Sequence, residues 1–145
     1  MTFIRWRDRW SVALWSFAIF MNASFALALW GAFDLRTAIV DFILTLVLTL
    51  LIAERTPLVI RVEGDWLYVG KAKIEKKFIS AVEILSKDEM SKLRTTDANP
   101  NAYLNLRFWV AEGIKIEISD TRDYTPYWLV STKSGSAIKK ALLEN

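Results

Sequence analysis

The sequence predicts an α+β membrane protein: a transmembrane helical hairpin followed by a small antiparallel β-barrel or sandwich that ends in a helix. Three observations predict this fold class. Residues 11–33 carry no charged side chain, residues 114–118 alternate between apolar and charged side chains, and residues 135–143 place their apolar side chains on one helical face. We therefore divide the chain into a hairpin, residues 1–56, and a β domain, residues 57–145.

The first apolar segment is long enough to cross a bilayer. A helix rises about 1.5 Å per residue, so residues 11–33 would reach about 34 Å, against a hydrocarbon core of about 30 Å. The second span, residues 37–53, is at the short end of the range and carries Asp41 one turn inside, at headgroup depth. Residues 34–36 would form the tight turn between the two spans.

The flanking charges predict the orientation of the hairpin. Cations precede the first span and follow the second, whereas the turn holds only Arg36, so the positive-inside rule places both termini and the β domain in the cytoplasm. We expect a multi-pass protein of the inner (plasma) membrane. A cleaved signal peptide is the alternative, because residues 26–28, Ala-Leu-Ala, have the small-x-small form of a cleavage site. The flanking cations are Arg5, Arg7, Arg9, Arg55 and Arg61. The aromatic residues expected at the membrane interface where the first span begins are Trp6, Trp10 and Trp15.

Small and polar residues recur at four-residue spacing within both spans. Small side chains let two helices approach closely, and a polar side chain can hydrogen-bond across the pair. We expect these residues to hold the two helices together; a polar transport or signalling site is the alternative. They are Asn22, Ser24, Ala28 and Ala32 on the first span, and Thr45 and Thr49 on the second.

The chain after Pro57 has the short alternating segments and turn signals of a β domain. About six antiparallel strands closed by a C-terminal amphipathic helix resemble the pleckstrin-homology superfold, in which that helix fills one open end of the barrel. The expected strands are residues 58–62, 66–69, 78–85, 103–110, 114–118 and 126–132, and residues 71–74 lead through a charged turn to the third of them. The expected helices are residues 87–94 and 135–143, and residues 95–101 form a polar loop.

One segment near the C-terminus carries a distinctive motif. Residues 120–133 read Asp-Thr-Arg-Asp-Tyr-Thr-Pro-Tyr-Trp-Leu-Val-Ser-Thr-Lys. This run resembles the signature of a family of actinobacterial membrane proteins, the domain of unknown function 3093, which usually has Asp-Pro-x-Asp-Pro-Thr-Pro-Tyr-Trp-Leu-Val-Ser-Thr-Arg. The chain departs from it at Thr121, Tyr124 and Lys133. Residues 67–70 match the family as well. Upstream of the motif, residues 102–103, Arg107 and residues 114–117 also match, whereas Phe108 replaces a proline of the family. The resemblance covers nearly the whole chain, but it implies no activity.

Composition excludes several kinds of chemistry. The chain has no Cys and no His, which removes disulfides, thiolate nucleophiles, imidazole bases and the usual zinc ligands. A net charge of +3 is too small for a nucleic-acid-binding surface. We therefore expect no catalytic residue, cofactor, metal or nucleic-acid partner.

A basic cluster is the first candidate binding site. Because the β domain would be tethered beneath the bilayer, these lysines are candidates for contact with anionic lipid headgroups, each worth about 1 kcal/mol near the surface. Glu75 lies among them, and solvated lysines in a charged turn are the alternative. The cluster comprises Lys71, Lys73, Lys76 and Lys77.

The family motif supplies the second candidate, a surface formed by Arg107, Asp120, Asp123, Tyr127 and Trp128. Successive strand residues point to opposite faces, so we expect only one of the two aromatic residues in the core, and the other on a ligand or peptide surface. The arginine would pair with one of the aspartates, either as a structural tie or as a site for an anionic group. Turn capping explains both aspartates more simply than metal binding or acid–base chemistry.

These observations favour a membrane-anchored, non-enzymatic interaction module, whose cytoplasmic domain binds a protein partner or anionic lipid headgroups. The first alternative is a structural accessory subunit that packs into a larger membrane complex through its hairpin. The second is a carboxylate-based enzyme that uses Asp120, Asp123 and Arg107.

Overall fold

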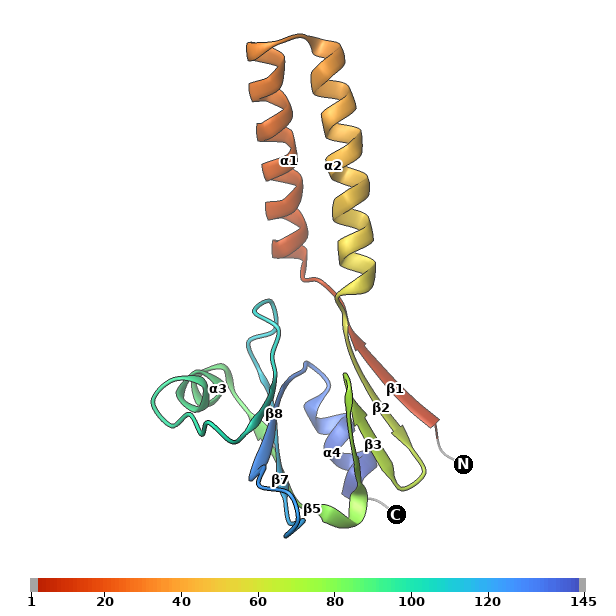
Figure 1. The fold of residues 1–145 in the computed structure, drawn as a ribbon, viewed down its shortest axis with the longest axis vertical. Coiled ribbons are helices and arrows are strands. Elements are labelled where there is room, and N and C mark those ends of the chain that lie inside the picture. The colour runs from red at the N-terminus through yellow and green to blue at the C-terminus, as the bar shows by residue number, and fades with distance from the viewer. Residues whose placement is uncertain (1–2, 144–145) are drawn as a thin grey trace. The chain divides into compact units, whose positions relative to one another are not determined.

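The computed structural model describes residues 3–143 and divides into two units (Figure 1). One unit is a helical hairpin, residues Arg9–Pro57. The other, here called the β unit, combines Phe3–Asp8 with the chain from Leu58 onward. The chain is thus an α+β protein with two long apolar helices, as the sequence predicts.

The hairpin consists of α1 (Val12–Ala32) and α2 (Leu35–Arg55). Both helices are long and apolar enough to cross a membrane, judged by length and composition. Each begins at a side-chain cap: Ser11 accepts a hydrogen bond from the amide of Leu14, and Asp34 accepts one from the amide of Thr37. Because α2 begins at Leu35, the turn is shorter than the expected residues 34–36.

Asn22 faces the second helix, as expected. Its Nδ2 donates to the Ala18 carbonyl at 2.7 Å and lies 3.4 Å from Thr49 Oγ1 on α2. Thr45 and Thr49 are half-buried between the helices. The residues expected beside Asn22 are instead exposed on the outer face of α1, because a two-residue step turns a helix by about 200°. These residues are Ser24, Ala28 and Ala32.

The first sheet of the β unit is an antiparallel meander of four strands in the order β1-β2-β3-β4. Gly64 has φ +55° in the β2–β3 turn, a conformation that glycine adopts at little steric cost. The strands are β1 (Phe3–Asp8), β2 (Leu58–Glu63), β3 (Trp66–Val69) and β4 (Ala72–Glu75).

Strand β1 corrects the expected division at residues 56 and 57, because Phe3–Asp8 belongs to the β unit. Trp6, expected at the membrane interface, packs against the main core, whereas Arg5 and Arg7 are exposed on the other face. Antiparallel pairing with β2 satisfies backbone groups that would otherwise form an open sheet edge. The helical hairpin is therefore an insertion between two paired strands.

The second sheet has the order β5-β7-β8-β6. The short helix η1 (Lys76–Phe78) leads into it from β4. Two expectations need correction: β6 runs parallel to β8, and it ends at Asn105 instead of residue 110, because the chain then turns, with the Arg107 amide donating to Ser131 Oγ. The strands are β5 (Ile79–Leu85), β6 (Tyr103–Asn105), β7 (Gly113–Ile118) and β8 (Tyr127–Ser131).

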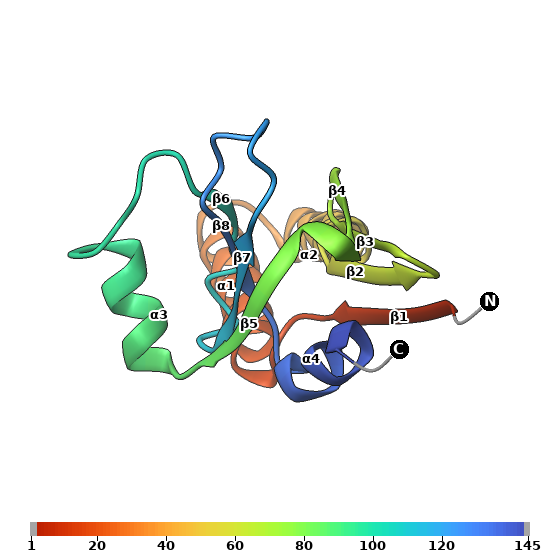
Figure 2. The ribbon, with the colours of Figure 1, turned by 90° about the horizontal axis from the view of Figure 1, so that it is seen from below.

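Two helices complete the β unit, on opposite sides of β7 and β8 (Figure 2). Helix α4 (Gly135–Leu143) contributes Ile138 and Leu142 to the main core, which also contains side chains of both sheets. Helix α3 (Lys87–Arg94) begins at a capping box formed by Ser86 and Glu89, and covers a second apolar cluster. That cluster comprises Leu85, Met90, Tyr127 and Leu129.

Candidate functional site

The β unit has two distinct ends, defined by the directions of its strands. At the end called here the attachment end, β1 stops at Asp8 opposite the first residue of β2, and the amide of Lys133 donates to Asp8 Oδ1 at 3.4 Å. The β3–β4 turn also lies there, since the Gly70 amide donates to the Val59 carbonyl at 3.2 Å.

The opposite end is called here the far end. It holds the β2–β3 turn, η1 and the turn between β7 and β8. The amide of Lys76 donates to the Asp65 carbonyl at 2.7 Å, and the amide of Ser119 donates to the Phe78 carbonyl at 2.8 Å. These bonds join turns of both sheets.

A polar pocket of about 200 Å³ lies at the far end, between the first sheet and the β7–β8 turn. Its walls combine charged side chains with aromatic rings. It is lined by Trp66, Lys73, Ile74, Glu75, Phe78, Asp120, Arg122, Asp123 and Trp128. Lys73 of the basic cluster and residues of the family motif, separate in the sequence, therefore meet in one pocket.

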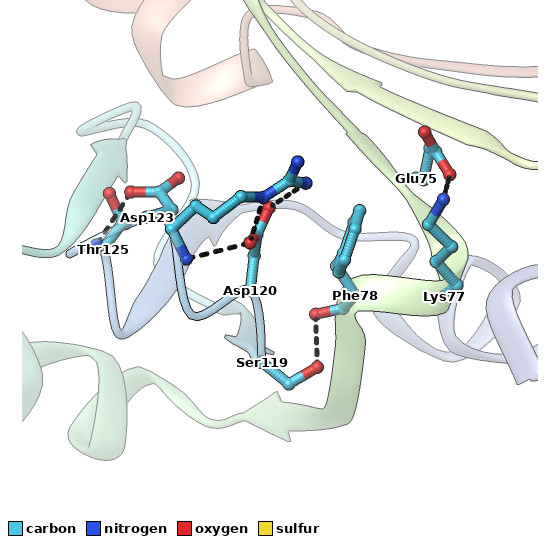
Figure 3. Close-up of polar contacts among 8 residues, drawn as sticks. Glu75, Lys77, Phe78, Ser119, Asp120, Asp123 and Thr125 are labelled. Atoms are coloured by element: carbon cyan, nitrogen blue, oxygen red, sulfur yellow. Dashed lines mark hydrogen bonds and ion pairs between the residues drawn. The ribbon is translucent and has the colours of Figure 1, made fainter.

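The β7–β8 turn is organised by its two aspartates (Figure 3). The Asp120 carboxylate accepts hydrogen bonds from both Nε and Nη2 of Arg122 at 3.1 Å. Its Oδ1 also accepts a hydrogen bond from the Arg122 amide at 3.0 Å. Asp123 Oδ1 accepts the Thr125 amide at 2.9 Å. Each aspartate therefore bonds to a backbone amide two residues further on, which is how such turns are stabilised.

The ion pair fixes the charge state of both partners. Hydrogen bonds from Arg122 lower the pKa of Asp120 below its ordinary value, and the nearby Lys77 charge acts in the same direction. Asp120 in turn raises the pKa of Arg122. Asp120 is consequently ionised at neutral pH and acts as a hydrogen-bond acceptor, not as a proton donor.

The cations around the pocket are stacked on aromatic rings. Lys73 Nζ lies 5.2 Å from the centre of the Trp66 ring, and the Arg122 guanidinium lies 5.4 Å from that of Phe78. Lys77 forms an ion pair with Glu75, and its Nζ also lies 4.8 Å from the Phe78 ring. Carboxylates and aromatic rings thus neutralise or cover much of the positive charge expected in the basic cluster.

The four lysines of the basic cluster do not form one surface. Lys73 lines the pocket, and Lys76 and Lys77 flank the far end, but Lys71 follows Gly70 at the attachment end. Lys71 and Lys76 flank the two ends of β4 and lie five residues, or about 16 Å, apart at a rise of about 3.3 Å per residue. The four lysines are close together in the sequence, but the extended strand β4 keeps Lys71 away from the lysines at the far end.

The expectation that only one of Tyr127 and Trp128 lies in the core is wrong, because both are buried. β8 is a central strand with the main core on one face and the α3 cluster on the other, so alternating side chains are both covered. Trp128 also packs on Tyr103, with ring centres 5.1 Å apart, and it is one of the residues that line the pocket.

Arg107 does not pair with the aspartates of the β7–β8 turn. Its Nη1 donates to the Leu106 carbonyl at 3.0 Å and to Asn105 Oδ1 at 3.3 Å, at the attachment end. Asp120 lies at the other end of β7, a strand about 20 Å long, and binds Arg122 instead.

Five pocket residues were not among the predicted site residues: Trp66, Ile74, Glu75, Phe78 and Arg122. Arg122 could have been found, because an arginine two residues after an aspartate in a turn is well placed to bind it. The two aromatic residues give no comparable signal, since each begins or precedes a strand whose other apolar residues form the core.

The fold and site define a class of protein: an apolar helical hairpin inserted into the first sheet of a β domain, with a polar pocket at the end remote from the insertion. The chain matches the model of the family described as "Protein of unknown function (DUF3093)" over residues 5–142, and it belongs to that family. Neither the curated proteins nor the solved structures gave a match.

Proposed function

We propose that this protein is a membrane-anchored, non-enzymatic interaction module, whose hairpin spans the cell membrane and whose β unit binds a protein partner in the cytoplasm. The far-end pocket is the observation that carries the proposal. The hairpin would act as a double tether, since residues 9–11 and 56–57 alone separate the paired strands from the two helices. The flanking cations favour a cytoplasmic β unit and cytoplasmic termini.

A pleckstrin-homology-like fold for the β unit is supported by the order of its elements. A four-stranded meander is followed by a second sheet, and a C-terminal helix packs into the core that the two sheets share. The parallel strand β6 and the inserted hairpin are additions to that plan. Because one fold can host unrelated functions, the ligand has to be argued from the pocket.

The pocket favours a protein segment over an anionic headgroup. Two cations, Lys73 and Arg122, line it together with three carboxylates, those of Glu75, Asp120 and Asp123. The three carboxylates would repel a phosphorylated headgroup. A peptide segment that carries a positive, a negative and an apolar side chain would find a complementary group in the pocket for each. The pocket also lies at the end of the β unit remote from both hairpin connections.

The carboxylates give little support to an enzymatic alternative. Asp120 accepts hydrogen bonds from Arg122, which lower the pKa of Asp120, and Asp123 accepts a hydrogen bond from the backbone amide of Thr125. A general acid needs a pKa near the working pH, and the environment of Asp120 moves its pKa in the opposite direction.

Affinity purification of the full chain from detergent-solubilised membranes tests the proposal. We expect a reproducible partner that is lost with Arg122→Ala and with Lys73→Ala, because each removes a pocket cation that is exposed to solvent. Lys87→Ala is the matched control, since Lys87 is an exposed cation on α3 that does not line the pocket. Recovery of the same partner with all three variants would contradict the pocket as its binding site.

A second candidate function is that of an accessory subunit. It is favoured by the outer face of α1, where Ser24, Ala28 and Ala32 are exposed at four-residue spacing, a pattern that suits close packing against another transmembrane helix. Ala28→Leu would then disrupt a larger complex, whereas Leu27→Phe, at an exposed position about 100° from Ala28 around α1, would not. An unchanged size of the detergent-extracted complex in both variants would exclude this function for α1.

A further inference from the structure

The turn between β6 and β7 presents an aromatic tip. The amide of Val110 donates to the Arg107 carbonyl at 3.0 Å, which closes a β-turn with Phe108 and Trp109 at its two central positions. Val110 is buried and fixes the base of the turn, whereas the Phe108 side chain is 78% exposed. The two aromatic rings meet edge to face with centres 4.9 Å apart.

Contacts within the β unit place this turn at the attachment end. The Arg107 amide donates to Ser131 Oγ, and the amide of Thr132 donates to the Glu112 carbonyl at 3.1 Å. The next residue, Lys133, donates to Asp8, the last residue of β1. In Figure 1 the turn extends beyond the upper end of β8, the end at which β7 begins.

We propose that the Phe108 turn inserts into the headgroup region of the bilayer that the hairpin spans, and so acts as a third membrane contact of the β unit. The inference rests on the proposed membrane anchor. The chain between Asp8 and α1 can reach at most about 14 Å, and that between α2 and Leu58 about 11 Å, so the attachment end stays close to the bilayer surface.

The composition of the attachment end fits such an interface. Aromatic side chains and cations are the residues enriched at headgroup depth. Beside Phe108, this end exposes Lys71 and Lys133; Glu112 is the exposed carboxylate of the turn. Exposure of an aromatic residue does not by itself single out this turn, since Tyr124 is 93% exposed. Tyr124, however, lies in the β7–β8 turn at the far end, where no hairpin connection leaves the β unit.

The absence of cysteine from the chain allows a direct test with single-cysteine variants. The full-length protein would be labelled with an environment-sensitive fluorophore and reconstituted into vesicles of zwitterionic and anionic phospholipid. Phe108→Cys and Ala111→Cys report on the turn, and the second keeps Phe108 in place. Tyr124→Cys reports on the far end, and Leu44→Cys on the middle of α2.

We expect labels at residues 108 and 111 to be quenched by lipids with a nitroxide near the headgroup and to be protected from aqueous iodide. The label at Tyr124 should show the reverse, and that at Leu44 should be quenched by nitroxides deep in the acyl chains. Iodide quenching at residues 108 and 111 equal to that at residue 124, with Leu44 still quenched from the lipid, overturns the inference and leaves the anchor intact. A Leu44 label open to iodide refutes the anchor, and the inference with it.

Discussion

Asp8 and Leu58 face each other as the terminal register pair of β1 and β2, although the whole helical hairpin lies between them in the sequence. The β unit is thus discontinuous, and its first strand is contributed by residues that precede the apolar segment. The two ends of the hairpin are joined to β1 and β2, which are adjacent strands of one sheet. The β unit is therefore complete only when the chain on both sides of the hairpin is present.

The discontinuity predicts which fragments fold. A fragment that starts at Pro57 lacks β1, so it exposes the edge of β2 and uncovers the part of the core that Trp6 contacts. A chain that joins Asp8 directly to Leu58 through an Asn-Gly turn restores the pairing with a two-residue connection suited to antiparallel strands. We expect cooperative thermal unfolding of the joined chain by circular dichroism, and aggregation of the fragment.

A control restores the missing strand β1 to the fragment without joining the two chains. Adding β1 as a separate peptide to the fragment from Pro57 should recover part of the structure. If that fragment unfolds as cooperatively as the joined chain, β1 contributes nothing to the β unit and this prediction is wrong.

Gly113 is predicted to be intolerant of any side chain. A Cβ at this position would overlap the carbonyl oxygen of Val130 on β8 and lie 2.7 Å from Cε of Met90. Backbone cannot move aside cheaply, so Gly113→Ala should lower the free energy of unfolding of the β unit by at least about 2 kcal/mol. Gly31→Ala is the control, because nothing lies within 4 Å of its added Cβ. Equal denaturation midpoints for the two variants in detergent would contradict the packing at β7 and β8.

The two buried aromatic residues of the family motif should respond oppositely to truncation. Trp128 is 5% exposed in the main core, so Trp128→Ala should cost about 3–5 kcal/mol of stability. The buried hydroxyl of Tyr127 has no hydrogen-bond partner among residues 3–143, so Tyr127→Phe removes an unsatisfied group and should be neutral or stabilising by up to about 1 kcal/mol. Chemical denaturation measures the free energy of unfolding of the two variants. A clear loss of stability in Tyr127→Phe would contradict the prediction, because it would reveal a hydrogen-bond partner for the Tyr127 hydroxyl.

The sequence predicted the elements that are specified by patterns within their own residues. Helix α3 was predicted from its early acids and late cations, and the structure adds the Ser86–Glu89 capping box at the same boundary. The alternation of residues 114–118 identified β7 because one face of that strand is buried and the other is not.

Features that depend on distant partners escaped prediction. Ile4 and Trp6 alternate with arginines, as the residues of a strand do. The same arginines precede an apolar segment, so they also fit the positive-inside rule, and the sequence alone does not distinguish a strand from a membrane flank. β8 looked half-buried because nothing local shows that α3 covers its second face. The pocket combines Lys73 with Arg122 only because η1 brings the second sheet back against the first.

The Asp120–Arg122 pair predicts a defined pH dependence. The pKa of Asp120 is lower in the folded protein than its ordinary value, because Arg122 donates hydrogen bonds to the ionised carboxylate. The pair therefore stabilises the turn fully above the unfolded-state pKa, near 4, and this contribution is lost as the pH falls through the lower folded-state pKa. In Arg122→Ala, the pKa of Asp120 measured by NMR should shift upward toward its ordinary value. An unchanged Asp120 titration in Arg122→Ala would show that the backbone amide alone sets its pKa.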